Sequence, residues 1–189
     1  MWRPDGGPLT VALQLAALLA FANATPHSNL PTGAAAAGRV ALADVCLRSV
    51  VEGRPIEDLA KAAGMSPTSS ALFGGTDRDR AWRLGLLKPS YVIAWAEGGC
   101  TAIVERGDAS ALGAMARAAI QSRPEGFRPG LSGLFDRDRV QRDIYCSERN
   151  GRWTLVSVTV PGPKANSRTR ALSSSVYARA TPSALCRAR

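Results

Sequence analysis

Apolar residues at helical spacing open the patterned part of the chain. Within residues 39–52, Leu42, Cys46 and Val50 recur every fourth residue and therefore lie on one face of a helix. Gly53 follows, and glycine is the residue type that most often ends a helix. The next stretch begins with a proline, carries its acids early and a lysine late, and stops at another glycine. Together the two segments predict an N-terminal helical hairpin.

A change to alternating apolar and polar residues indicates strands after a polar loop at residues 64–77. Residues 82–86 alternate in this way, whereas residues 91–95 are apolar throughout, which predicts a strand covered on both faces. The glycine pair at 98–99 predicts a hairpin turn into a returning strand at 100–105. The middle of the chain is therefore expected to form a small antiparallel unit.

A third helix and a second group of strands follow. Asp108 suits the N-cap of a helix that runs to about residue 122, ahead of a Pro/Gly-rich loop at 124–133. Strands at 140–148 and 153–160 flank Asn150-Gly151, a dipeptide typical of two-residue hairpins. The chain then has the signature of a meander at its C-terminal end.

Helices and strands occur in separate runs, with a last strand at 171–180. Such runs favour an α+β protein over a doubly wound sheet. We expect the helical hairpin and one further helix to pack on a mainly antiparallel sheet of about five to six strands, in a single domain over residues 39–189. One tetrapeptide, Asp-Arg-Asp-Arg, occurs twice, at 77–80 and at 136–139, and precedes a predicted strand each time.

The first residues carry an uncharged apolar run from Leu9 to Ala22. This run is shorter than the roughly 20 residues that span a bilayer, and it ends in small residues suited to signal peptidase. We expect residues 1–24 to be a signal peptide and residues 25–38 a flexible leader. A weakly positive start leaves a buried or membrane-anchoring helix as the alternative. No later stretch predicts a transmembrane segment, so the mature protein is expected in the periplasm or secreted.

Four cysteines, Cys46, Cys100, Cys146 and Cys186, suit an exported chain because oxidising compartments favour disulfides. No two have the CxxC spacing of a redox pair or zinc knuckle. Cys46 faces the sheet from the first helix, near Cys100 just after the glycine turn. Cys186 lies in a tail that can fold back onto the strand of Cys146. Of three pairings, we predict Cys46–Cys100 and Cys146–Cys186.

A net charge of +9 widens the range of expected partners. Positive charge attracts anionic envelope components such as lipopolysaccharide or phospholipid headgroups. Only Lys61, Lys88 and Lys164 are lysines among 24 basic residues, so the arginine-rich composition of a GC-rich genome is the alternative explanation. The basic residues are scattered among acids without interleaved aromatics, which argues against a nucleic-acid partner.

No catalytic, cofactor or metal site is predicted. His27, the one histidine, lies in the expected leader, where an imidazole is poorly placed for a triad or a metal site. The acids of the Asp-Arg-Asp-Arg segments are flanked by guanidinium groups, which disfavour a cation. The segment at 130–133 lacks the second spacer of a GxSxG elbow, and no phosphate-binding glycine loop occurs.

Carboxylates and aromatic residues leave two further functional hypotheses open. A His-independent glycan hydrolase needs two convergent carboxylates. The candidates are Glu97, Glu105, Glu125 and Glu148. Aromatic residues in the predicted strands favour core packing, with a carbohydrate-stacking platform as the alternative where several share an exposed face. These aromatic residues are Trp82, Tyr91, Trp95, Tyr145, Trp153 and Tyr177.

Three features resemble small exported proteins of Gram-negative bacteria that have no assigned function. They are the Cys-bearing helix ADVCLRSVVEG, the hairpin WAEGGCTAIVERGD and the Asp-capped, Ala-rich helix, within residues 40–120. The resemblance implies a periplasmic location and no activity.

Taken together, these features favour a non-enzymatic binding or accessory module of the cell envelope. Its expected partner is an anionic envelope component or another periplasmic protein. A glycan hydrolase and an inhibitor or immunity-type protein are the alternatives. A cleft with two facing carboxylates would favour the hydrolase, and a protruding rigid loop at 124–139 would favour the inhibitor.

Overall fold

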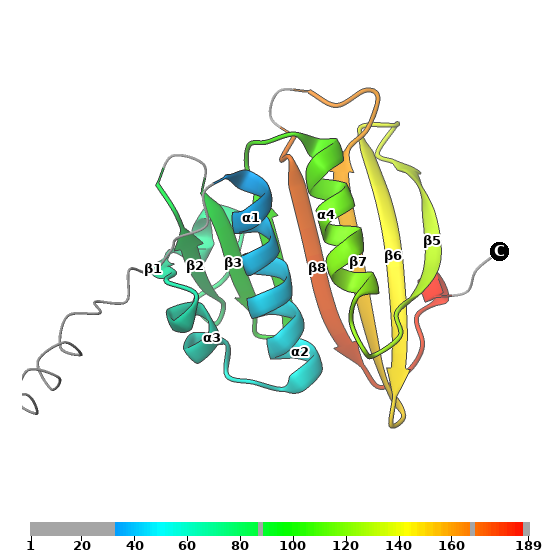
Figure 1. Ribbon diagram of the computed structural model, residues 1–189, viewed down its shortest axis with the longest axis horizontal. Coiled ribbons are helices and arrows are strands. Elements are labelled where there is room, and N and C mark those ends of the chain that lie inside the picture. The colour runs from blue at the N-terminus through cyan, green and yellow to red at the C-terminus, as the bar shows by residue number, and fades with distance from the viewer. Residues whose placement is uncertain (1–32, 87–88, 167–168, 187–189) are drawn as a thin grey trace, which may run out of the picture.

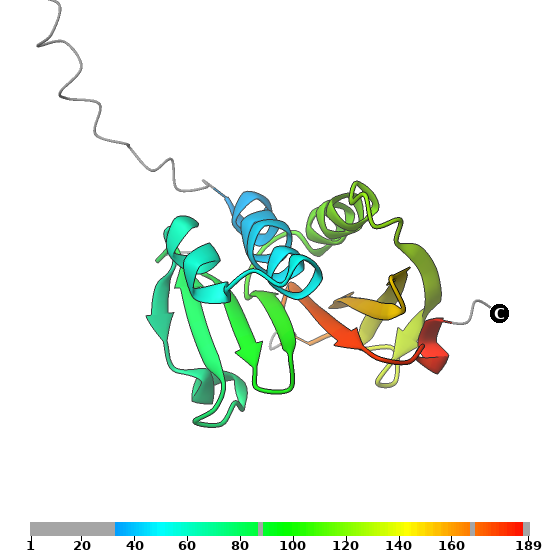
Figure 2. The ribbon, with the colours of Figure 1, turned by 90° about the horizontal axis from the view of Figure 1, so that it is seen from below.

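A computed structural model describes residues 33–86, 89–166 and 169–186 of the chain. The predicted signal peptide and most of the predicted leader lie outside the described residues. The protein is α+β, with its α-helices on one side of a single antiparallel sheet (Figures 1 and 2). No helix in the described ranges is long and apolar enough to cross a membrane.

The N-terminal helical run is continuous and precedes one short helix and one longer helix. It consists of α1 (Ala34–Arg39), the π-helical η1 (Val40–Leu47) and α2 (Arg48–Glu52). The other two helices are α3 (Ile56–Ala62) and α4 (Ala109–Gln121). Gly53 ends the first run at φ 69°, a left-handed conformation that costs glycine little. Asp108 caps α4 as predicted, because its carboxylate accepts hydrogen bonds from two backbone N–H groups at 2.8 and 3.0 Å.

The helical layer differs from the predicted hairpin. The first run starts at Ala34, so residues 34–38 of the expected flexible leader are helical. Alanine has the highest helix propensity, and Gly38 packs so closely that an added Cβ would lie 3.0 Å from side chains of Val104 and Met115. Since α3 has only seven residues, α4 is the main regular α-helix.

The sheet has eight strands in the order β1-β2-β3-β4-β8-β7-β6-β5, and all neighbouring strands are antiparallel. The order describes two four-stranded meanders, β1–β4 and β5–β8, that meet where β4 pairs with β8 (Figure 1). The strands are β1 (Ser66–Thr68), β2 (Arg80–Leu84), β3 (Ser90–Trp95), β4 (Gly99–Val104), β5 (Arg128–Phe135), β6 (Val140–Arg149), β7 (Arg152–Pro161) and β8 (Leu172–Arg179).

The prediction of five to six strands is therefore wrong. The two strands missed are the edges, β1 and β5, which lie in segments predicted to be loops. Each carries a proline, Pro67 or Pro129, a residue that edge strands tolerate because only inner strands need every N–H. The register of β5 also shifts between Pro129 and Ser132. Both features hide the alternation by which a strand is recognised.

Buried residues form a main core between the helices and the sheet and two smaller clusters on the opposite face. The main core includes the fully buried Leu42, Val92 and Val156. On the opposite face, η2 (Ser70–Phe73) packs over one cluster and η3 (Ala184–Cys186) over the other. Between these two clusters no element of the described residues covers the face of the sheet (Figure 2).

Two disulfides fasten these layers. Cys46 of η1 bonds Cys100 of β4, with 5.3 Å between their Cα atoms, and so holds the first helical run on the sheet. Cys146 of β6 bonds Cys186 of η3, with 5.7 Å between their Cα atoms, and so folds the C-terminal tail back. Both predicted pairings are confirmed.

Candidate basic binding site

The β6–β7 hairpin places two arginines side by side at one end of the sheet. Its turn residues, Asn150 at φ 54° and Gly151 at φ 72°, adopt the left-handed conformations typical of a tight hairpin. The register sets Arg149 directly opposite Arg152. Opposite residues share a face and have Cβ atoms about 5 Å apart, so their like charges destabilise the hairpin.

A hollow with a volume of ≈ 540 Å³ lies on the helix side of this hairpin. We call it the basic bay, lined by Val50, Val51, Glu52, Glu125, Ser147, Arg149, Asn150, Arg152 and Thr154. The end of α2, the segment after α4 and the two strands of the hairpin form its walls. Its size falls within the range of about 300–1,000 Å³ found for small-molecule sites.

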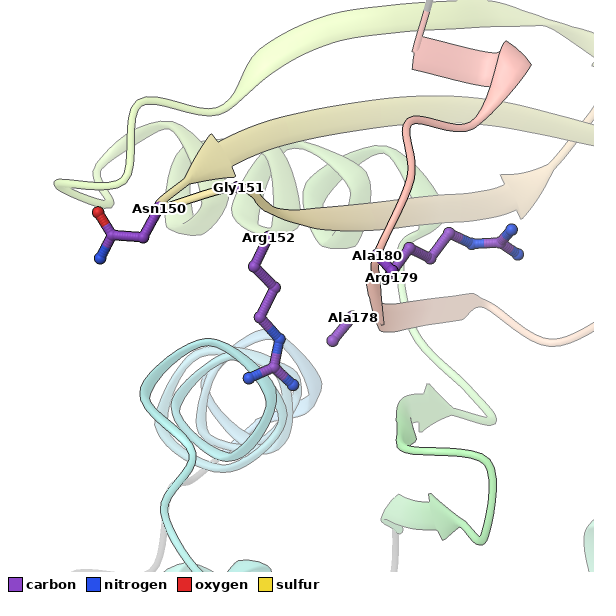
Figure 3. A pocket seen from close by; sticks show the side chains of 6 residues that line it. All are labelled: Asn150, Gly151, Arg152, Ala178, Arg179 and Ala180. Carbon is purple, nitrogen blue, oxygen red and sulfur yellow. The ribbon is translucent and has the colours of Figure 1, made fainter.

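A second hollow of ≈ 390 Å³ adjoins the basic bay at the hairpin. Figure 3 shows Arg152 reaching from the hairpin toward the first helical run, while the side chain of Arg179 points away from it. Asn150 and Arg152 line both hollows, which therefore form neighbouring parts of one end of the molecule. The Arg152 guanidinium is accessible from this end because the residue is exposed.

The carboxylates of the basic bay are already neutralised by other arginines. Arg123 donates to Glu125 through Nε at 3.0 Å and through Nη2 at 2.9 Å, and the same Nη2 lies 2.9 Å from Glu52. Arg48 donates to Glu52 at 3.3 Å. The hydrogen bond from Arg123 holds the pKa of Glu52 below its ordinary value, although burial opposes this shift.

Arg149 and Arg152 differ from these arginines. Among the described residues, no carboxylate forms an ion pair with either guanidinium. The floor beside them is polar and fixed, since Ser147 donates a 2.6 Å hydrogen bond to the backbone oxygen of Glu125. Thr154 lies opposite Ser147 in the register, and both are buried. The site therefore presents two guanidinium groups that are available to a ligand, beside a polar surface formed by the Ser147 and Thr154 hydroxyl groups.

The four carboxylates considered for glycan hydrolysis do not converge. Glu97 lies in the β3–β4 turn, Glu105 lies 3.6 Å from the guanidinium of Arg170, and Glu148 is exposed near the end of β6. The carboxylates that do meet are Glu52 and Glu125, joined by Arg123. A glycosidase acid needs a raised pKa, whereas that of Glu52 is lowered. The arrangement does not suit a general acid.

The two Asp-Arg-Asp-Arg segments occupy equivalent turns, between the first and second strands of each meander. In the first, Asp79 accepts hydrogen bonds from Thr76 and from the backbone N–H of Ala96 at 2.7 to 2.8 Å. In the second, Asp138 pairs with Lys164 at 3.0 Å. In the part of the chain that the structure describes, no group of His, Cys, Asp or Glu side chains is suited to a metal ion.

The aromatic residues divide between the two faces of the sheet. Trp82 and Tyr145 are buried in the main core, as core packing predicts. The other four lie on the opposite face, beside its two smaller clusters, and are only half-buried. They are Tyr91, Trp95, Trp153 and Tyr177.

Arg149 and Arg152 were not singled out as site residues by the sequence pattern, although a signal for them exists. In the sequence Arg-Asn-Gly-Arg, a two-residue turn sets the flanking arginines opposite each other. The Glu52–Arg123–Glu125 group has no comparable signal, because its members come from α2 and from the segment after α4. Only the packing of these two segments brings the group together.

The 124–139 segment also differs from the protruding loop that the inhibitor hypothesis requires. Half of it is strand β5, hydrogen-bonded to β6, rather than a protruding loop. The comparisons with known proteins add no name to this geometry. No protein-family model matches the chain, and neither a curated protein nor a solved structure matches it significantly.

Proposed function

We propose that the chain is an exported, non-enzymatic binding module of the cell envelope that holds a phosphate-bearing component in the basic bay. The observation that carries this proposal is the like-charged pair Arg149 and Arg152 at the rim of a ≈ 540 Å³ hollow, neither of which forms an ion pair within the described residues. Like charges set directly opposite each other cost stability, and an anion bound between them offsets that cost.

The chemistry of the pair suits phosphate. A guanidinium donates two parallel hydrogen bonds to a phosphate or carboxylate, and such charge-assisted bonds are about twice as strong as neutral ones. The neighbouring acids, Glu52 and Glu125, do not compete because Arg123 binds both. A short hairpin turn fixes the backbone spacing of the two arginines, so binding has to order only their side chains.

Export supports an envelope role. The apolar leader in residues 1–24 has the features of a cleaved signal, and two disulfides are typical of an oxidising compartment such as the periplasm. The net charge of +9 attracts the protein to anionic envelope surfaces, and the basic bay gives that attraction a defined site.

The test compares vesicles of phosphatidylglycerol with vesicles of phosphatidylcholine, using the full mature chain in a co-sedimentation assay. We expect binding to phosphatidylglycerol that weakens steeply between low salt and 0.15 M salt, where the Debye length is about 8 Å. The double variant Arg149→Gln/Arg152→Gln should reduce this binding at least about tenfold, because each charge-assisted bond contributes about 1.5–3 kcal/mol.

A matched control removes the same charge elsewhere. Lys61 and Arg106 are exposed and far apart in the sequence, so Lys61→Gln/Arg106→Gln changes the net charge equally without touching the basic bay. Equal losses in the two double variants would refute a defined site. Soluble glycerol phosphate distinguishes the source: competition by it assigns the bay to the phosphate group itself, and absence of competition assigns it to the lipid surface.

A further inference from the structure

The face of the sheet that lies away from the helices has a patch of hydroxyl groups at its centre. We call it the hydroxyl patch, made of Thr101, Ser157, Thr159, Ser173 and Ser175. In the register, Thr101, Ser175 and Ser157 form one row across β4, β8 and β7, and Ser173 and Thr159 begin the next row. Thr101 is buried and the other four are half-buried, so the patch is a surface rather than part of a core.

Hydrogen bonds fix part of this surface in place. The indole Nε1 of Trp95 donates to the Thr101 hydroxyl at 2.8 Å, and that hydroxyl lies 2.9 Å from the hydroxyl of Ser175. The chain of bonds sets the orientation of the indole ring and joins three strands. A surface ordered in this way loses little entropy when a ligand binds.

Half-buried aromatic rings stand on both sides of the hydroxyl patch. Tyr91 and Trp95 belong to the cluster under η2, and Trp153 and Tyr177 belong to the cluster beside η3. The ring of Tyr177 lies against the backbone of Gly99, where an added Cβ would approach it to 2.6 Å. Any larger residue at this position would displace the ring.

Arginines without carboxylate partners border the same face. Arg142 lies opposite Thr159 and donates to its hydroxyl at 3.4 Å, with its guanidinium 5.1 Å from the ring centre of Phe135. Arg179 lies opposite Trp153 and is exposed. Within the described ranges, neither forms an ion pair. Glu148 is an acid on this face, at its border next to Trp153.

We propose that this face binds an acidic polysaccharide chain, at a site separate from the basic bay. Sugar rings offer apolar faces to aromatic side chains and hydroxyl groups to serine and threonine, and their carboxylates complement Arg142 and Arg179. A protein interface would also carry aromatic residues and arginine, but such interfaces are depleted in serine, whereas three serines lie at the centre of this face. The proposal goes beyond phosphate binding and does not depend on it.

The experiment titrates the mature, oxidised chain with an oligogalacturonate and with a malto-oligosaccharide of equal length. Binding is followed by calorimetry and by tryptophan fluorescence. We expect the acidic oligosaccharide to bind more tightly than the neutral one and to change the fluorescence. Ser157→Asp places a carboxylate inside the hydroxyl patch and should weaken the acidic ligand about fivefold or more through charge repulsion.

A matched variant carries the same charge on the other face. Ser132→Asp also replaces a serine in a strand, but Ser132 is exposed and lies opposite Asp143, away from the hydroxyl patch. We expect it to leave oligogalacturonate binding unchanged. Equal weakening by the two variants, or equal affinity for the neutral oligosaccharide, would overturn the proposal.

The variants of the basic bay separate the two proposals. Arg149→Gln/Arg152→Gln should leave oligogalacturonate binding within about twofold of the wild type. If that double variant abolishes the binding while Ser157→Asp has no effect, the acidic ligand lies in the basic bay and the proposal for this face is wrong. Loss of vesicle binding alone, with oligogalacturonate binding intact, leaves this proposal standing.

Discussion

Asp77 and Asp79 have the same side chain and lie two residues apart, yet the structure gives them different tasks. Asp79 ties the turn before β2 to the β3–β4 turn through Thr76 and the backbone N–H of Ala96. Within the described residues, Asp77 forms no side-chain hydrogen bond and no ion pair. The hydrogen bonds, first of all that from the Thr76 backbone, hold the pKa of Asp79 below its ordinary value.

We predict that Asp79→Asn lowers the melting temperature at neutral pH, whereas Asp77→Asn leaves it nearly unchanged. An amide cannot accept all the hydrogen bonds that the carboxylate accepts, and it carries no charge. Because the pKa of Asp79 is lowered on folding, its contribution is fully present above the ordinary value of 3.8 and is lost as the pH falls through the lowered value.

Thermal unfolding followed by circular dichroism checks this prediction across a pH series. The difference in melting temperature between wild type and Asp79→Asn should persist down to pH 3.8 and shrink only at lower pH. A difference that vanishes already at a higher pH, or equal effects of the two substitutions, would contradict the assigned role.

At the level of elements, the turn between β5 and β6 has an uncommon backbone. Asp136, Arg137 and Asp138 all adopt left-handed conformations, with φ of 50°, 54° and 67°. Aspartate tolerates this region better than most other residues with a side chain, whereas an arginine there costs roughly 1–2 kcal/mol. The Asp138–Lys164 ion pair and the hydrogen bond from the Gly162 N–H to the Arg139 oxygen hold this turn against the segment that follows β7.

Arg137→Gly should therefore stabilise the protein by up to about 1 kcal/mol. Glycine removes the steric cost of the left-handed conformation, and its greater freedom in the unfolded chain offsets part of the gain. Arg137→Ala serves as the control, because alanine removes the side chain but keeps the Cβ. Chemical denaturation measures both. A glycine variant no more stable than the alanine variant would show that the turn carries no such cost.

The sequence predicts the inner elements of the sheet better than its edges. Asn150-Gly151 and the glycine turn before Cys100 locate two hairpins because their backbone requirements are local. The edges, β1 and β5, contain proline and a register shift, so their pairing is set by the neighbouring strand rather than by their own pattern. Local preference alone does not reveal such strands.

The candidate site was less predictable than the fold. Hairpin register is a local property, and it is enough to set Arg149 opposite Arg152. Whether either guanidinium finds a carboxylate depends on which segments pack nearby. Glu52 and Glu125 lie close by in space, and they are bound by Arg123 instead. That choice of partner follows from tertiary packing and has no signature in the order of residues.

At the level of the whole molecule, the two meanders are parts of one continuous sheet but differ in their helices. The first meander follows the long run Ala34–Glu52 and the short α3, and the second follows α4 alone. Pairing of β4 with β8 joins them within the sheet, and α1 packs against α4 on the helix side. The main core draws on residues from both parts of the chain.

Each disulfide closes inside one of these parts. Cys46–Cys100 lies wholly before α4, and Cys146–Cys186 lies wholly after it. Arg106 and Gly107 are exposed in the connection between β4 and α4, and no covalent bond among the described residues spans that connection other than the main chain. A break in the main chain at this connection would therefore leave each disulfide within one fragment.

Fragments 25–106 and 107–189, expressed together in an oxidising compartment, should reassemble into the native sheet because apolar surface on each half has no cover without the other. Co-purification and a melting transition close to that of the intact chain would report it. A split inside β7, between Ser157 and Val158, should fail because it cuts a central strand. Fragment complementation at the exposed connection would turn the chain into a two-component reporter, whose halves meet only where both are exported.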